Sequence, residues 1–328
     1  MKNTVWHGAR RRIRMQDVGP RDGLQIEPVF VPTADKIALV NALSRTGLAK
    51  IEVTAFVSPK AIPAMRDADE VMRGIERAPG VEYAVLVPNV RGAERAIDVQ
   101  ADELNLVMSA TETHNLANLR MTRDQSFAAL TAVTTLGHDA RIPVNISLSC
   151  TFGCPMEGDV PMAVVLDWCA RFADLGARGI TLADTTGMAH PAQVSAIAHA
   201  FRTRWPDLQL TMHFHDTRGL AVANVLASID AGVDRFDASL GGLGGCPYAP
   251  GASGNACTET LVHALELMDY DTGVDLAALL AASRRLPALV GHETPSPIVK
   301  AGRRLDLHPV PEWFDEVAAR ARDRGPRI

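Results

Sequence analysis

Strand-like and helix-like runs alternate eight times along the chain, and this alternation restricts the possible folds more than any other feature of the sequence. The predicted strands are short, largely apolar runs at Ile13–Val18, Lys50–Ala55, Glu82–Val87, Leu104–Met108, Val144–Ser149, Gly179–Ala183, Leu208–His215 and Asp234–Ser239. The predicted helices follow them at Ala34–Thr46, Asp67–Arg77, Arg91–Val99, Thr122–Gly137, Met162–Leu175, Pro191–Arg204, Leu220–Ala231 and Asn255–Met268. Eight such units within ~250 residues predict an α/β protein with a closed (β/α)₈ barrel, the TIM-barrel fold.

An open, doubly wound parallel sheet is the alternative to a closed barrel. Such a sheet usually has a G-x-G-x-x-G turn after its first strand, whereas this chain has Gly19-Pro-Arg-Asp-Gly23 there. The alternation stops near Thr272. We therefore expect residues 1–272 to form the barrel, which would carry any catalytic site. Residues 273–328 should form a C-terminal helical extension packed on the barrel, with helices at Asp275–Leu286 and Pro311–Arg322.

Composition narrows the class of partner. The chain has 328 residues, of which 47% are hydrophobic and 22% charged, as in ordinary globular proteins. Its net charge is −5 and it has no long basic block, so a nucleic-acid partner is not expected. No apolar run approaches the ~20 residues of a membrane-spanning helix, so we expect no membrane partner. Five cysteines, an odd number in a large chain, indicate free thiols and predict a cytoplasmic protein.

Two histidines near the end of the seventh predicted strand are the first candidates for chemistry. Side chains on a strand alternate between its faces, so His213 and His215 point the same way and Asp216 points the other way. A same-face pair suits a divalent metal, although two structural histidines remain an alternative on these residues alone. We expect Asp216 to orient a histidine or the turn that follows it.

Other polar residues recur at the carboxyl ends of the predicted strands, where barrel enzymes have their active sites. They include Arg21, Asp22, Glu52, Asp184 and Asn255. Each has a plainer explanation, because the aspartates could form turns, the asparagine could cap a helix and the glutamate could pair with the arginine. A site that combines two histidines with Asp22 and Asn255 mixes nitrogen and oxygen donors, and it would suit Mg²⁺ or Mn²⁺ better than a thiolate-rich zinc site would.

Cys246 lies in a glycine-rich loop after the last predicted strand. Glycines make a loop mobile and let its backbone approach a ligand closely. A thiol in such a loop could act as an acid or base, with its pKa tuned by a nearby metal. The glycine run lacks the Lys-Ser/Thr pair of a phosphate-binding loop, so it does not predict one.

Four motifs together resemble the 3-hydroxy-3-methylglutaryl-CoA lyase family of metal-dependent TIM-barrel lyases. They are Val18-Gly-Pro-Arg-Asp-Gly-Leu-Gln25, Phe56-Val-Ser-Pro-Lys60, His213-Phe-His-Asp-Thr217 and Gly242-Leu-Gly-Gly-Cys-Pro-Tyr248. The resemblance runs from about Ile13 to about Val290, and the Cys246 loop is its most specific part. The resemblance implies an acyl-CoA substrate and a homodimer or larger homo-oligomer.

The resemblance implies a retro-Claisen cleavage of 3-hydroxy-3-methylglutaryl-CoA into acetyl-CoA and acetoacetate, a step of leucine degradation. A divalent metal, Mg²⁺ or Mn²⁺, would bind the hydroxyl and carboxylate oxygens of the substrate and acidify the hydroxyl. The implied metal ligands are Asp22, His213, His215 and Asn255.

The resemblance also assigns roles to the other residues at the rim of the barrel. Arg21 would stabilise negative charge on the thioester oxygen as the enolate forms. Cys246 would exchange a proton with that enolate, on a loop that closes over the site. Glu52 and Asp184 would be supporting acidic residues, and His213 could share in proton transfer.

One substrate-binding position departs from the family pattern. The animal enzymes have tyrosine where this chain has Ser147, so a substrate contact is absent and the cavity is larger if this position lies in the pocket. A related branched 3-hydroxyacyl-CoA is therefore an alternative substrate. A Claisen condensing synthase of the same superfamily is less favoured, because such chains usually carry a large C-terminal regulatory region. A barrel that only binds acyl-CoA is disfavoured, because the rim residues are all present.

Overall fold

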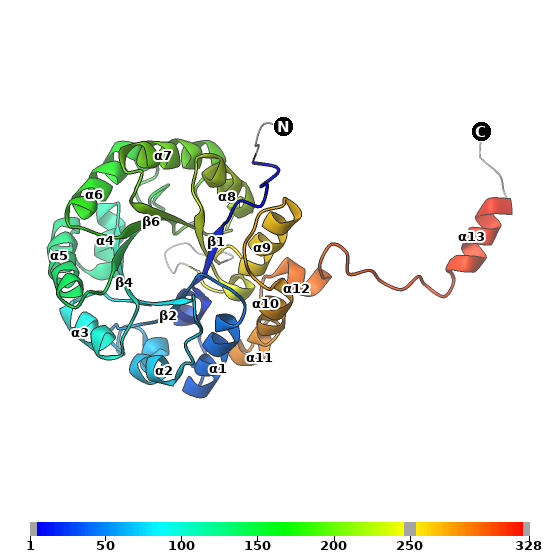
Figure 1. Cartoon of the computed structure of the whole chain (residues 1–328), viewed down its shortest axis with the longest axis horizontal. Helices are drawn as coiled ribbons and strands as arrows, with labels where there is room; N and C mark the ends of the chain where they lie inside the picture. The colour runs from blue at the N-terminus through cyan, green and yellow to red at the C-terminus, as the bar shows by residue number, and fades with distance from the viewer. Residues whose placement is uncertain (1–4, 246–253, 324–328) are drawn as a thin grey trace.

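The computed structural model describes residues 5–245 and 254–323. Its eight strands are parallel and close into a barrel in sequence order, with β8 paired back to β1 (Figure 1). The strands are β1 (Arg14–Asp17), β2 (Lys50–Ala55), β3 (Glu82–Leu86), β4 (Glu103–Ser109), β5 (Val144–Ser149), β6 (Gly179–Asp184), β7 (Gln209–Phe214) and β8 (Arg235–Ala238). The predicted TIM barrel is confirmed, and each strand begins and ends within about one residue of its expected bounds.

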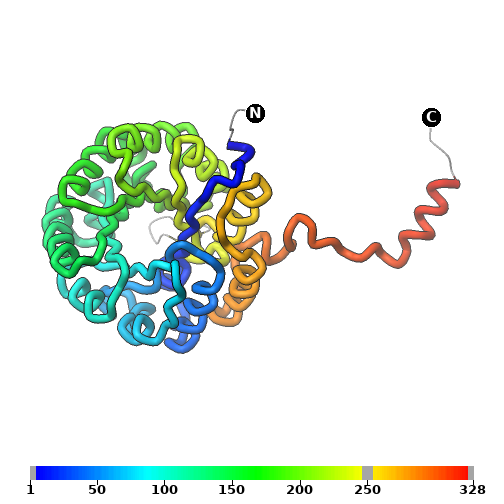
Figure 2. Tube along the Cα trace, in the orientation of Figure 1, coloured from blue at the N-terminus to red at the C-terminus, as the bar shows by residue number. Residues whose placement is uncertain are grey.

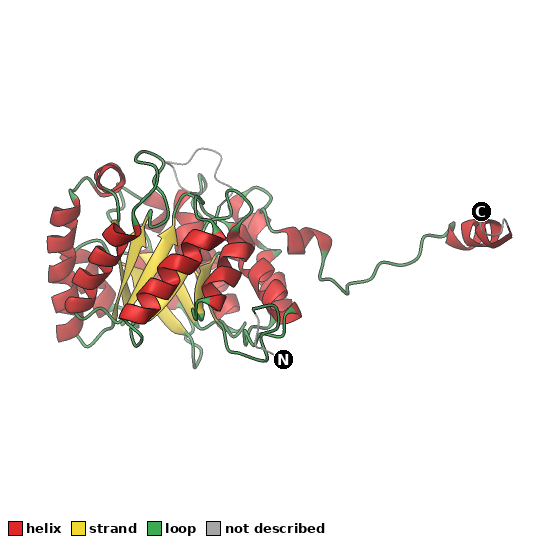
Figure 3. Cartoon of the chain, turned by 90° about the horizontal axis from the view of Figure 1, so that it is seen from above, coloured by secondary structure: helices red, strands yellow, loops and turns green. Residues whose placement is uncertain are grey.

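Helices form a ring around the barrel, outside the strands (Figures 1 and 3). The helices between strands are α1 (Thr33–Ser44), α2 (Ala68–Gly74), α3 (Val90–Asp98), α4 (Glu112–Leu119), α5 (Arg123–Asp139), α6 (Met162–Asp174), α7 (Pro191–Arg204) and α8 (Ala221–Asp230). Those after β8 are α9 (Thr258–Leu267), α10 (Leu276–Ser283), α11 (Leu286–Val290), α12 (Pro297–Ala301) and α13 (Phe314–Asp323). Short helical turns cover Gly19–Gly23, Leu24–Ile26, Pro63–Met65 and Leu240–Gly242.

Several helix predictions need correction. The helix expected at Asp275–Leu286 ends at Ser283, and α11 and α12 were not predicted. We did not predict α4, because its eight residues include too few apolar side chains to show a helical period. We expected the helix after β8 to begin at Asn255, but α9 begins at Thr258. Asn255 instead forms an isolated bridge with His215, which ties this segment to the end of β7.

The barrel has an apolar outer layer and a polar interior. Side chains that point outward from the strands, such as Ile51, Leu106 and Phe214, are buried beneath the helices. A small cavity inside the barrel is instead lined mainly by polar and charged side chains: Gln16, Lys50, Glu52, Glu103, Asn105, Asn145, Thr181 and Asp237. Ion pairs from Lys50 and Arg178 to Glu103 fill the interior at the amino ends of the strands. The amino ends of the barrel interior are therefore closed by charged side chains.

The C-terminal extension packs on the barrel only in part. α10 contacts both α1 and α9, and α9 contacts β1 and β8. α13 lies away from the barrel, beyond an extended segment at residues 302–313 (Figures 1 and 2). Leu305 and Leu307 on that segment are 70% and 86% exposed. The expectation that the whole extension packs on the barrel is thus wrong for its last part, because periodicity can predict an amphipathic helix but not what it contacts. Within the described ranges, no helix is long and apolar enough to cross a membrane.

Candidate metal centre and active site

A tight turn after β1 brings Arg21 and Asp22 to the mouth of the barrel. The backbone N–H groups of residues 21, 22 and 23 all donate to the carbonyl oxygen of Val18, at 3.1, 2.7 and 3.2 Å. Pro20 stands near the start of the turn, where its missing N–H costs no hydrogen bond. Both Arg21 and Asp22 are buried. The turn therefore fixes a cation and a carboxylate side by side.

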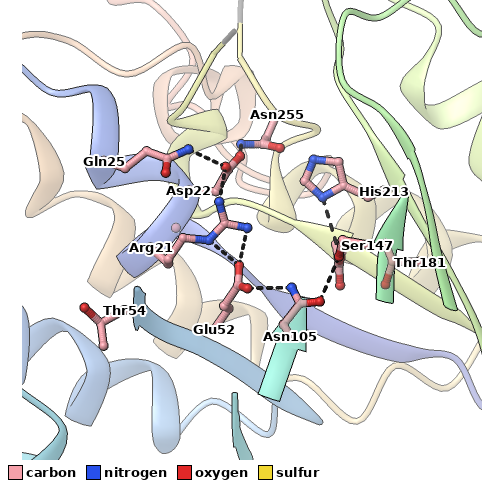
Figure 4. A network of polar contacts seen from close by, with 12 residues as sticks. Arg21, Asp22, Gln25, Glu52, Thr54, Asn105, Ser147, Thr181, His213 and Asn255 are labelled. Carbon is pink, nitrogen blue, oxygen red and sulfur yellow. Dashed lines mark hydrogen bonds and ion pairs between the residues drawn. The ribbon is translucent and has the colours of Figure 1, made fainter. Parts of the chain in front are cut away.

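Asp22 meets the two histidines of the β7 end inside the mouth. One candidate ligand atom from each of Asp22, His213 and His215 lies within 4.8 Å of the others, and all three residues are buried. The two imidazole rings are 5.2 Å apart between their centroids. Figure 4 shows His213 reaching toward Asp22 and Asn255 from the opposite side of the mouth. Three of the four residues expected to bind a metal therefore form one cluster.

Asn255, the fourth expected ligand, reaches this cluster from the chain after β8. Its Nδ2 donates to Asp22 Oδ2 at 2.8 Å and to a backbone carbonyl oxygen at 2.9 Å. The close approach depends on Gly244, whose φ is +102° and where a Cβ would lie 2.5 Å from Asn255 Nδ2. Asn255 does not cap α9, because the N-cap position belongs to Cys257. Its side chain is thus held in the mouth.

Two buried polar atoms of the cluster lack a hydrogen-bond partner among the described residues: Asn255 Oδ1 and His215 Nδ1. Leaving a buried polar atom unpaired costs roughly 1–3 kcal/mol. Burial lowers the pKa of His215 to about 3, with the proximity of His213 adding to the effect, so this imidazole is neutral. Amide oxygens and neutral imidazole nitrogens are ordinary metal ligands. The unpaired atoms therefore fit a bound cation.

The charges at the mouth also fit a cation. Three carboxylates lie here, Asp22, Glu52 and Asp237, and we call them the mouth carboxylates. Arg21 interacts with all three, so one positive and three negative charges leave −2 when the histidines are neutral. Burial alone would raise the pKa of Asp22, but Arg21 and the two imidazoles outweigh it and lower the pKa to about 2. Burial likewise lowers the pKa of His213, but contact with Asp237 and the charge of Asp22 raise it overall. A divalent cation would balance this site.

Arg21 is held in one orientation by two carboxylates. Its Nε and Nη2 both lie 2.5 Å from Glu52 Oε2, and its Nη1 lies 2.5 Å from Asp22 Oδ1. Burial would lower the pKa of Arg21, but Glu52 and Asp22 raise it overall, so the guanidinium stays charged. Burial raises the pKa of Glu52, and Arg21 opposes that shift. The predicted Glu52–Arg21 pair is confirmed as a contact.

Three polar residues of the mouth were missed by sequence reasoning. Asn105 on β4 donates through Nδ2 to Glu52 Oε1 at 2.6 Å, and Gln25 donates to Asp22 Oδ1 at 2.8 Å. Asp237 on β8 lies 3.5 Å from His213 Nδ1. Both strand residues are polar positions within otherwise apolar runs, which is the signal that could have found them.

Ser147, the position that departs from the family pattern, lies in the same polar network (Figure 4). Its Oγ donates to Asn105 Oδ1 at 2.9 Å, while Asn145 donates to the same oxygen at 3.0 Å. The side chain faces the barrel interior beside Asn105, and its place in a substrate pocket stays a prediction. A serine here leaves room that a tyrosine would fill.

Asp184 and Asp216 both hold turns. Asp184 Oδ1 accepts from the backbone N–H groups of Met188 and Ala189, at 2.7 and 3.1 Å. Burial raises the pKa of Asp184 to about 6, against those two hydrogen bonds. Asp216 Oδ1 accepts from the N–H of Ala221 at the start of α8, which confirms its expected role in the turn. Cys246 lies outside the described residues, so its expected position is not tested.

Fold and site together define a class: a (β/α)₈-barrel protein with a candidate divalent-metal centre at the carboxyl ends of its strands. A family model described as HMGL-like matches residues 12–286. Hydroxymethylglutaryl-CoA lyase YngG of Bacillus subtilis is 47% identical over 286 residues, which cover 87% of this chain and 96% of that protein. The human mitochondrial hydroxymethylglutaryl-CoA lyase is 40% identical over 295 residues, 90% of this chain and 91% of that one.

Solved structures agree with these sequence matches. An HMG-CoA lyase from Acinetobacter baumannii, in complex with coenzyme A and 3-methylmalate, superposes with a TM-score of 0.88 at 51% identity and covers 95% of this chain and all of its own. The carboxyl transferase domain of Rhizobium etli pyruvate carboxylase shares the fold at 19% identity and a TM-score of 0.69. The chain belongs to the HMGL-like family, among the hydroxymethylglutaryl-CoA lyases.

Proposed function

We propose that this protein is a hydroxymethylglutaryl-CoA lyase that cleaves 3-hydroxy-3-methylglutaryl-CoA to acetyl-CoA and acetoacetate. The observation that carries the proposal is the convergence of Asp22, His213 and His215 within 4.8 Å, beside the buried cation Arg21. This cluster occurs in a chain that aligns along nearly its whole barrel with proteins of that name. Its position at the carboxyl ends of the strands is where barrel enzymes bind substrates.

Asp22, His213, His215 and Asn255 would hold a divalent cation. We propose Mg²⁺ or Mn²⁺ because two of the four donors are oxygens and none is a thiolate. When bound, such an ion supplies Lewis acidity that makes the tertiary hydroxyl of the substrate easier to deprotonate. The protein contributes a buried, preorganised set of ligands, so little reorganisation is needed when substrate arrives.

The remaining steps fall to side chains of this chain. Loss of the hydroxyl proton allows the C2–C3 bond to break, and its electron pair passes to the acetyl-CoA enolate. Arg21, fixed by two carboxylates, stabilises negative charge on the thioester oxygen of that enolate. Cys246 donates a proton to the enolate carbon and so releases acetyl-CoA. The hydroxyl proton passes to a carboxylate at the mouth, and His213, as a ligand of the cation that would acidify the hydroxyl, shares in that transfer.

Glu52 and Asp184 are proposed as the supporting acids. Glu52 acts by holding Arg21, as the 2.5 Å contacts indicate. Asp184 holds the loop after β6 through one oxygen, while its Oδ2 is buried without a hydrogen-bond partner among the described residues. That free oxygen, on a carboxyl whose pKa burial raises to about 6, suits an interaction with substrate or with His213.

The decisive experiment is incubation of the purified chain with 3-hydroxy-3-methylglutaryl-CoA and Mg²⁺. Equal amounts of acetyl-CoA and acetoacetate are expected, EDTA should stop the reaction, and Mg²⁺ or Mn²⁺ should restore it. Full turnover by the metal-free protein would refute the metal role. A product formed from acetyl-CoA and a 2-oxo acid would instead favour a condensing synthase.

The role of Cys246 is tested by Cys246→Ser, which should lose nearly all turnover. Cys169→Ser is the matched control, because the Cys169 thiol lies in the packed outer layer on α6, where burial raises its pKa to about 12. Near-normal turnover of Cys246→Ser would contradict the proposed proton transfer.

Ser147 bears on the choice of acyl chain. The serine lies in the barrel interior and donates to Asn105, and its short side chain would leave more room for a larger substituent than a tyrosine would. A kinetic comparison of 3-hydroxy-3-methylglutaryl-CoA with longer and shorter branched 3-hydroxyacyl-CoA esters decides which acyl chain is preferred. A markedly higher kcat/KM for a longer ester would move the assignment to a related acyl-CoA lyase.

We further propose that the protein acts in the cytoplasm, in leucine degradation, as a homodimer or larger homo-oligomer. Three of the described cysteines, Cys154, Cys169 and Cys257, are free thiols, which supports a reducing compartment. Light scattering of the purified chain would measure the oligomeric state.

A further inference from the structure

We propose that Asp237 is a positioning residue for the metal centre: it fixes the orientation and tautomer of His213 so that Nε2 is presented to the cation. This inference rests on the proposed metal-ligand role of His213, but it does not depend on which acyl-CoA is the substrate. Asp237 was not among the residues expected from the sequence, and its role follows from its place on β8.

The barrel register places the two residues opposite each other. His213 on β7 is the Cα partner of Asp237 on β8, and both side chains point into the interior, where they are about 10% exposed. His213 Nδ1 lies 3.5 Å from Asp237 Oδ2. The same strand pairing holds both residues, so the contact is set by backbone register rather than by a flexible loop.

The chemistry of the pair determines the tautomer. A carboxylate has no proton to donate, so the imidazole nitrogen that contacts it must carry the hydrogen. With the proton on Nδ1, Nε2 keeps its lone pair and is the nitrogen available to a cation. A carboxylate partner also orients the ring and raises the basicity of the ligating nitrogen. The two histidines therefore differ, because His215 Nδ1 has no hydrogen-bond partner among the described residues.

A simpler role for Asp237 would be to balance the charge of Arg21. Arg21 already makes direct ion pairs with Glu52 and Asp22, each with atoms 2.5 Å apart. The direct ionic contact of Asp237 is with His213 instead. Asp237 thus acts on the metal cluster through His213 rather than through Arg21.

The test is the affinity of the metal-free protein for Mn²⁺, measured by electron paramagnetic resonance in Asp237→Asn. Asparagine keeps the shape but can donate to Nδ1, which permits the wrong tautomer. We expect Mn²⁺ binding to weaken by about 10- to 100-fold. The control is Asp234→Asn, because Asp234 pairs with Arg14 at the opposite end of the same strand. Its Mn²⁺ affinity should equal that of the parent.

Circular dichroism and the melting temperature of each metal-free variant establish whether it is folded. A folded Asp237→Asn that binds Mn²⁺ within about twofold of the parent would overturn the inference. A parent that binds no Mn²⁺ would overturn the proposed metal site itself, so the two failures are distinguishable. A drop in affinity confined to Asp237→Asn supports the inference.

A second measurement needs no variant of Asp237. Nitrogen-15 NMR of the metal-free parent, at a pH where the imidazole is neutral, reports which nitrogen of His213 carries the proton, and His213→Gln assigns the signal. The proton is expected on Nδ1. A proton on Nε2 would refute the proposed contact even if Asp237→Asn failed to fold.

Discussion

Replacing Glu52 by glutamine tests whether Arg21 needs a carboxylate to hold it. Arg21 Nε and Nη2 both approach Glu52 Oε2 at 2.5 Å, and Asn105 Nδ2 donates to Oε1 at 2.6 Å. Both oxygens therefore face donors, and glutamine offers one acceptor with an NH₂ group in place of the other. The side-chain amide of Asn105 cannot rotate to offer its oxygen to the new NH₂ group, because its Oδ1 already accepts from Asn145 and Ser147.

The cost follows from these contacts. A hydrogen bond to a charged group contributes about 1.5–3 kcal/mol, and a buried donor left unpaired costs about 1–3 kcal/mol. We therefore expect Glu52→Gln to lower the free energy of unfolding by about 2–4 kcal/mol. Because Arg21 would then lose the fixed orientation that its proposed role on the thioester oxygen requires, kcat should fall by about 100-fold while KM changes much less.

Release of acetoacetate measures kcat, and urea unfolding measures stability. The control is Glu82→Gln, which removes a carboxylate paired with Lys50 and Arg178 at the opposite end of the barrel interior. It should lower stability without changing kcat. A Glu52→Gln enzyme whose kcat stays within about threefold of the parent would refute the view that Glu52 acts by orienting Arg21.

Three further perturbations follow from the same structure. Burial raises the pKa of Asp17 from 3.8 to about 7 despite its hydrogen bond from Thr258, so the folded chain keeps this proton to higher pH than the unfolded chain. The free energy of unfolding should therefore fall as the pH rises from 4 to 7. Urea titrations at several pH values should show that Asp17→Asn removes this dependence. A chain ending at Ala301 should unfold at the same urea concentration as the parent, since residues 303–316 are exposed. A clearly lower urea midpoint would show that the removed residues contribute to stability. Mn²⁺ at about 100 times its dissociation constant should add about 2.7 kcal/mol to the unfolding free energy of the parent and little to that of His215→Ala, as calorimetry would measure.

The barrel could be predicted because the same strand–helix pattern occurs eight times in the sequence. Each strand is a short apolar run followed by a helical period, and eight repeats leave few other folds. The prediction is weakest where a single element stands alone. α4 is short and polar, and α13 follows an extended segment that no neighbouring element constrains. Local pattern predicts that such a helix forms, but its place depends on contacts that the pattern does not encode.

The site could be predicted only where unusual residues follow a strand. His213 and His215 stand out because two imidazoles share a face, and Arg21 and Asp22 stand out in the turn after β1. Asn105 and Asp237 were missed for a physical reason. Barrel interiors are usually filled by branched apolar side chains, so a polar residue inside a strand is unusual, but the strand pattern does not say which residues of other strands it meets. Only the closed barrel brings residues from β2, β4, β7 and β8 to one mouth.

The carboxylates at the two ends of the barrel interior differ in how they are paired with cations. This difference indicates, without reference to any related protein, at which end of the strands the active site is expected. At the amino ends of the strands, each carboxylate has a direct cationic partner, in the pairs Glu82–Arg178, Glu82–Lys50, Glu103–Lys50, Glu103–Arg178 and Asp234–Arg14. At the carboxyl ends, the three mouth carboxylates share Arg21, and the raised pKa of His213 reflects how strongly this end favours another positive charge. Uncompensated buried charge is costly, so the negative charge left over at this mouth is the physical argument for the proposed cation.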